Sequence, residues 1–70
     1  MEVRVDEKAK YYVINAQGLE GKRVDVYVGD KYLLTAEVGR KGLIRIRKDR
    51  DAGKALKLAL AKGEKVKVRF

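Results

Sequence analysis

Basic side chains in the second half of the chain are the residues whose type and spacing point most clearly to chemistry. The 70-residue sequence has 18 Lys and Arg against 10 Asp and Glu, a formal net charge of +8. Residues 1–35 hold six basic and six acidic side chains, so the whole excess lies in residues 36–70. Ammonium and guanidinium groups gathered in this way attract anions, phosphates above all. We therefore expect an anionic partner.

Two stretches, 43–48 and 65–70, alternate apolar and basic residues, as strands with one buried face do. Their outward rows hold five cations and no acid. Like charges facing one another across a sheet repel, and bound phosphates would relieve that repulsion. With neighbouring cations and one outward tyrosine, the predicted nucleic-acid-binding residues are Arg40, Lys41, Arg45, Arg47, Lys48, Arg50, Lys65, Lys67, Arg69 and Tyr27.

Each of these features also has a simpler structural interpretation. Solvated basic rows need no partner, and lysine on an exposed strand discourages edge-to-edge pairing. Tyr27 is the best of the four tyrosines for stacking on a base, but such tyrosines are also common as half-buried sheet residues. Lys54, Lys57 and Lys62 either contact phosphate or form the wet face of an amphipathic helix. Both interpretations remain open at this stage.

Composition removes most catalytic chemistry. Ser, Cys and His are absent, so nucleophile–base pairs and the usual ligands of zinc, haem and iron–sulfur clusters are missing. Asp49 and Asp51 flank Arg50, a poor cage for a cation, and we interpret them as helix N-cap residues. The glycines of 18–22 lie too close together for a phosphate-binding loop. We expect no catalytic, metal or cofactor site, and no enzymatic activity.

Six strands and one helix must position the cations. Residues 51–62 favour a helix, because Ala, Leu and Lys are strong helix formers and Gly63 suits the position after its end. The face expected to be buried consists of Ala52, Ala55, Leu56, Ala59 and Leu60. Alternating leucines over 54–61 favour a strand instead. The predicted strands are 2–5, 10–15, 23–28, 31–38, 43–48 and 65–70, with Val24, Val26, Val28, Ile44, Ile46, Val66, Val68 and Phe70 inward.

Short strands at regular spacing predict a mainly β fold. We expect a small six-stranded, pseudo-symmetric β-barrel with one short helix, about 51–62, before the last strand. The alternative is a seven-stranded β-sandwich with 54–61 as a strand. The chain reads as one domain, 1–70, with an internal repeat of 1–28 and 34–70 that rests on strand spacing and a Gly-x-x-Val-x-Val ending.

The second repeat carries a family resemblance. Gly42-Leu43-Ile44-Arg45-Ile46, a helical stretch, and then Leu60 to Val68 resemble the half-barrel of cradle-loop barrels, which include AbrB-type swapped-hairpin DNA-binding domains and double-psi barrels. The resemblance implies a small barrel and, for the AbrB type, DNA binding. Arg47 stands where the AbrB pattern has proline, and 48–63 is about one helical turn longer, so individual DNA contacts are not carried over.

These observations favour a small basic β-barrel that binds DNA or RNA, largely through the phosphate backbone and with weak sequence specificity, in a chromatin-like or ribosome-associated role. The alternative is a designed or simplified structural barrel, or a protein-interaction module. High charge without Cys is typical of thermostable proteins and of designed ones. Without a signal peptide or apolar span, we expect a cytoplasmic protein with no membrane partner, as a monomer or homodimer.

Overall fold

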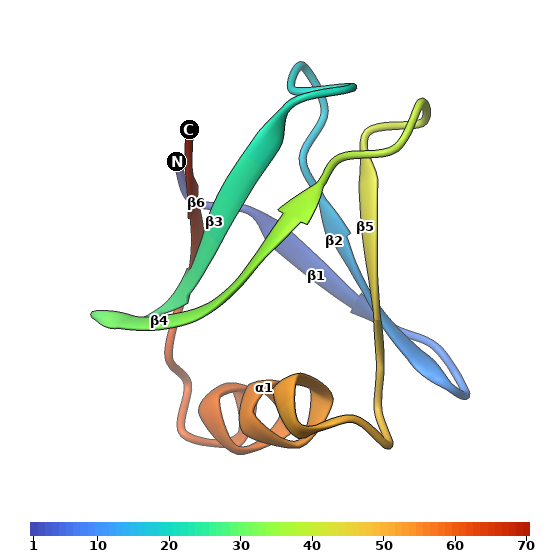
Figure 1. Ribbon diagram of the computed structural model, residues 1–70. Helices are drawn as coiled ribbons and strands as arrows, with labels where there is room; N and C mark the ends of the chain where they lie inside the picture. Colours follow the sequence, from blue (N-terminus) through green and yellow to red (C-terminus); the bar gives the residue numbers. More distant parts are fainter.

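The computed structural model describes all residues, 1–70, as six strands and one helix (Figure 1). The mainly β prediction, with the helix before the last strand, is confirmed. In chain order the elements are β1 (Arg4–Glu7), β2 (Tyr11–Asn15), β3 (Arg23–Val28), β4 (Lys31–Glu37), β5 (Leu43–Arg47), α1 (Asp51–Ala61) and β6 (Val66–Arg69).

The strands form two antiparallel three-stranded sheets, in the orders β1-β2-β5 and β4-β3-β6. Residues 1–3, which precede β1, join the sheets on one side: Val3 N donates to Val66 O at 2.9 Å and Val68 N to Met1 O at 2.8 Å. Figure 1 shows the two chain ends side by side there, with α1 lying across one end of both sheets. Because residues 1–3 pair with β6 and not with β2, β1 starts at Arg4, two residues later than predicted.

On the other side β4 and β5 do not pair, so the predicted barrel does not close. The reason is where the intervening backbone makes its hydrogen bonds. Val38 N donates to Lys22 O, Gly21 N donates to Val38 O, and Ala16 N donates to Gly42 O. Because loop 16–22 holds both ends of the connection between β4 and β5, the two strands remain separate edges.

Residues 54–61 are helical, so the seven-stranded sandwich is wrong. A strand would have placed three alternating leucines on one face, whereas in α1 Leu56 is fully buried and Leu58 is 65% exposed. The buried helix residues are Gly53, Leu56 and Ala59, a narrower face than predicted, and Ala55 and Leu60 are exposed. At 11 residues, α1 is too short to span a bilayer.

The helix begins at Asp51 and ends before Gly63, as predicted, but the predicted N-cap is wrong. Gly63 follows the C-cap Lys62 with φ of +77°, a conformation that glycine adopts without strain. The N-cap residue is Arg50, which makes no side-chain capping bond, and Asp51 lies in the first turn. There the charge of Asp51 still interacts favourably with the positive end of the helix dipole.

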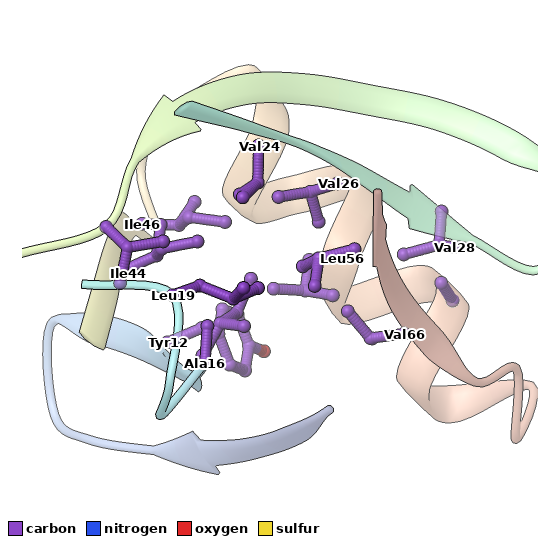
Figure 2. Packing of buried hydrophobic residues seen from close by; sticks show 14 residues of the cluster. Tyr12, Ala16, Leu19, Val24, Val26, Val28, Ile44, Ile46, Leu56 and Val66 are labelled. Atoms are coloured by element: carbon purple, nitrogen blue, oxygen red, sulfur yellow. The ribbon is translucent and has the colours of Figure 1, made fainter. Parts of the chain in front are cut away.

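One buried cluster of 14 apolar side chains joins both sheets and the helix. Leu56 reaches its centre, near Val26 and Val66 (Figure 2). The predicted inward rows of β3, β5 and β6 are confirmed for every residue except Phe70, whose side chain is 77% exposed beyond the end of β6. Burial of these side chains favours folding mainly because it removes apolar surface from water.

The strand pairing is nearly symmetric between the two predicted repeats, of which the first contains β1, β2 and β3 and the second most of β4, then β5 and β6. Exchanging β1 with β4, β2 with β5, and β3 with β6 maps the β2–β5 and β3–β6 pairs onto themselves. It also maps the β3–β4 pair onto the contact between β6 and residues 1–3. The β1–β2 pair alone has no counterpart, because β4 and β5 are apart. The internal repeat of 1–28 and 34–70 stays a prediction.

Gly53 stands in the helix for a steric reason. A Cβ atom at this position would lie 2.0 Å from the carbonyl oxygen of Arg47. The missing side chain therefore allows α1 to lie directly on the backbone at the end of β5. The low helix propensity of glycine is the cost of this contact.

Gly53→Ala is expected to destabilise the protein by about 1–3 kcal/mol, because overpacking against backbone outweighs a propensity gain of about 1 kcal/mol. The free energy of unfolding in urea measures the change. Ala55→Gly, at an exposed position of the same helix, is the control and should cost about 1 kcal/mol. A more stable Gly53→Ala variant would contradict the steric explanation.

Candidate nucleic-acid interface

The two predicted rows of cations lie on different sheets. β5 pairs with β2, where Arg45 is opposite Val13 and Arg47 opposite Tyr11. β6 pairs with β3 in the other sheet. The prediction that the two rows repel one another across one sheet is therefore wrong, because non-local pairing separates them. The ten predicted residues form two groups.

The first group, which we name the β5 basic edge, runs along the unpaired side of the molecule. It begins in the turn before β5, continues on the outer face of that strand and ends in the turn before α1. Its members are Arg40, Lys41, Arg45, Arg47, Lys48 and Arg50. Since β5 is an edge strand, this group is open to a partner along the length of the strand.

A hollow of about 380 Å³ lies between the end of β4 and the start of β5. Arg40, Lys41 and Arg45 line it, and none of the three forms an ion pair within the chain. Glu37 is the one acidic side chain in the lining. The separation of β4 from β5 thus produces a concave surface with an excess of positive charge.

Loop 16–22 holds the basic turn in place. Gln17 Nε2 donates a 2.6 Å hydrogen bond to Lys41 O, and Glu20 Oε2 accepts one of 2.7 Å from Gly18 N. Gly42 is buried with φ of +75°, and a Cβ there would lie 2.7 Å from Glu20 Oε2. No local pattern indicates a role for Gln17 or Glu20, because Gln17 bonds to Lys41 and Glu20 lies beside Gly42, both of which are distant in the sequence.

Two members of the β5 basic edge already have acidic partners. The guanidinium of Arg47 donates two bonds of 3.1 Å, from Nε and an Nη, to the Asp49 carboxylate, which lowers the pKa of that carboxyl. Lys48 Nζ lies 2.8 Å from Glu7 Oε2 and 5.1 Å from the centre of the Tyr12 ring. Lys48 therefore joins the end of β1 to the end of β5 rather than standing free. Asp49 contacts Arg47 instead of acting as the predicted helix cap.

Glu7 offers a direct test of the Lys48 contact. The hydrogen bond and positive charge of Lys48 lower the pKa of Glu7, against a small opposing effect of burial, and Lys57 adds slightly. Lys48→Met is expected to raise the pKa of Glu7 towards its ordinary value. A carboxyl-carbon NMR titration measures it, with Asp49 as the internal control because its partner Arg47 is retained. An unchanged Glu7 titration would contradict the contact.

The lowered pKa of Glu7 determines how the stability of the fold changes with pH. The Glu7–Lys48 contact stabilises the fold above the unfolded-state pKa of Glu7 and ceases to do so as pH falls through the folded-state pKa. Acid unfolding of the Lys48→Met variant should therefore lack this part of the pH dependence.

The second group, which we name the Tyr27 face, lies on the outer side of the β4-β3-β6 sheet. It consists of Tyr27, Lys65, Lys67 and Arg69. Lys67 is opposite Tyr27 in register, and the guanidinium carbon of Arg69 lies 5.8 Å from the centre of the Tyr27 ring. Lys65 contacts Glu2 at 3.3 Å, so Lys67 and Arg69 are the cations of this group without an ion pair.

Tyr32 and Thr35 belong beside this face, although neither is among the predicted binding residues. The Tyr32 ring meets the Tyr27 ring edge-on, with centres 5.9 Å apart. A two-residue turn at Gly29-Asp30 places Tyr27 opposite Tyr32, so hairpin register was the signal available for finding it. The extra residue of β4 that follows, Leu33, cannot be read from that register.

Comparison with protein-family models, curated proteins and solved structures gives no match to this chain. The resemblance to cradle-loop barrels therefore stays a prediction.

Proposed function

We propose that the protein binds the phosphate backbone of DNA or RNA through the β5 basic edge. The observation that carries this proposal is the 380 Å³ hollow lined by Arg40, Lys41 and Arg45, three cations without acidic partners. Unpaired cations gathered on one concave surface hold counterions that phosphates displace, and this release favours binding. Arginine adds forked donors that match the geometry of a phosphate.

Backbone contacts of this kind carry little sequence information. The exposed cations of the edge outnumber the amide and hydroxyl side chains near it, and Gln17 is already bonded to backbone. We therefore propose weak sequence specificity and a binding role rather than an enzymatic one. Arg47 and Lys48 contribute less to phosphate binding than Arg40, Lys41 and Arg45 do, because Asp49 and Glu7 already pair with them.

The first test replaces the three lining cations with glutamine. Arg40→Gln/Lys41→Gln/Arg45→Gln is expected to lower affinity for a duplex oligonucleotide on the order of 100-fold at about 50 mM salt. The log–log salt slope should fall in magnitude by about 0.9 for each lost contact with duplex DNA. Fluorescence anisotropy across a salt series measures both quantities.

The matched control removes the same charge from another surface. Lys54, Lys57 and Lys62 are exposed on α1 and its C-cap and form no ion pair. Their replacement by glutamine should change affinity far less and leave the slope nearly unchanged. Equal losses in the two triple variants would mean that net charge alone attracts the ligand. Failure of the unaltered protein to bind at low salt would reject nucleic-acid binding and favour the structural or protein-interaction alternative.

A gain-of-affinity variant tests the same surface from the other direction. Asp49→Asn removes the carboxylate that engages Arg47, which frees its guanidinium on the β5 basic edge. Affinity should rise several-fold, and the salt slope should steepen by about 0.9. Asp30→Asn, which makes the same charge change on the hairpin of the other sheet, is the control for duplex binding. Equal gains from the two substitutions would show that position is irrelevant.

A further inference from the structure

The outer face of the β4-β3-β6 sheet contains a second hollow, of about 370 Å³. Tyr27, Lys67 and Arg69 line it together, although they come from two strands that lie far apart in the sequence. Its volume is within the range of about 300–1,000 Å³ that is usual for small-molecule sites. The fold thus brings one aromatic ring and two cations to the same concavity.

The aromatic side chains here are held in fixed positions. Tyr27 is half-buried on the central strand β3, and Tyr32 is 57% exposed beside it. Tyr32 Oη and Thr35 Oγ1 lie 2.7 Å apart, and Thr35 Oγ1 donates to Asp25 Oδ1 at 2.6 Å. This chain of hydrogen bonds holds Tyr32 against the Tyr27 ring, so that little conformational freedom is lost when a flat ligand stacks on Tyr27.

The charge of this hollow favours an anion. Asp30 is the one carboxylate in its lining, against Lys67 and Arg69. Asp25 is opposite Arg69 in register, but the two form no ion pair, and the guanidinium lies over the Tyr27 ring instead. Both cations are therefore available to a phosphate beside an aromatic surface.

We propose that the Tyr27 face binds one unpaired base and its phosphate, so that single-stranded nucleic acid is the preferred ligand. The base stacks on the Tyr27 ring, beside which Tyr32 stands nearly perpendicular, and Lys67 and Arg69 contact the phosphate. A duplex stacks its base faces internally and cannot present one to this surface. This inference rests on the proposed function for its ligand class, but it adds a second surface and a preference that the β5 basic edge does not provide.

The test compares one sequence as single strand and as duplex. The unaltered protein should prefer the single strand, and Tyr27→Leu should lower single-strand affinity about 10-fold while leaving duplex affinity unchanged. Tyr27→Phe keeps an aromatic surface and should retain the preference. Tyr11→Leu makes the same replacement on the other sheet and should not alter the ratio of the two affinities. Circular dichroism verifies that each variant is folded.

A second variant leaves the half-buried Tyr27 in place. Lys67→Gln/Arg69→Gln alters two exposed side chains and should also reduce the preference for single strand. Because the chain has no Trp, quenching of tyrosine fluorescence reports stacking directly. Quenching by single strand should be strong in the unaltered protein and weak in Tyr27→Phe, which still binds but lacks this fluorophore.

The outcomes separate the two proposals. Duplex binding that depends on the β5 basic edge, with no single-strand preference and no effect of Tyr27→Leu, would overturn this inference and leave the proposed function intact. A nucleoside monophosphate, titrated alone by NMR, distinguishes the two sources of the ligand. Chemical-shift changes at Tyr27, Lys67 and Arg69 without oligonucleotide binding would support a free-nucleotide site and reject the proposed function. Absence of any shift with either ligand would overturn the site.

Discussion

The hydrogen bonds of the connection between β4 and β5 are the constraint on which the rest of the structure depends. Because Val38 and Gly42 bond to loop 16–22, the chain cannot lay β5 along β4, and the two sheets stay open on that side. The hollow, the exposed edge of β5 and the place that α1 covers all follow from this separation. Gly53 completes the arrangement, since its missing side chain lets the helix lie on the backbone at the end of β5.

Ion pairs within the chain engage some of the exposed cations and leave others unpaired. Pairing with Asp49, Glu7 and Glu2 uses three of the predicted binding cations in contacts within the chain. Exposed pairs of this kind contribute little to stability, but they determine which cations are free to meet a ligand. The unpaired ones fall into two groups on different sheets, one concave and basic, the other aromatic and basic. The ligand that we propose, single-stranded nucleic acid, offers phosphates to the first surface and base faces to the second.

Most of the secondary structure could be predicted from the sequence, because each strand buries every second residue and that periodicity is local. The inward rows of β3 and β5 follow from it directly. Residues 51–62 fit both periodicities, and helix propensity was the better guide. Glycine at position 53 has low helix propensity, and the reason for it, the nearby carbonyl of Arg47, lies in the preceding strand and not in the helix. The Tyr32 position followed from the register of a two-residue turn, whereas loop 16–22 offered no comparable local signal.

The sequence by itself determined the mainly β composition, the outward direction of the cations on β5 and β6, and the concentration of positive charge after residue 35. It favoured a helix at 51–62 but left a strand at 54–61 as the alternative. Only the tertiary structure decided which strands are neighbours: β5 beside β2, β6 beside β3, and β4 apart from β5. That decision placed Arg45 and Arg69 on different surfaces and joined Tyr27 with Lys67. The reason is physical. Side-chain direction depends on neighbours along the chain, whereas strand pairing depends on backbone hydrogen bonds between distant segments, to which every residue offers almost the same groups.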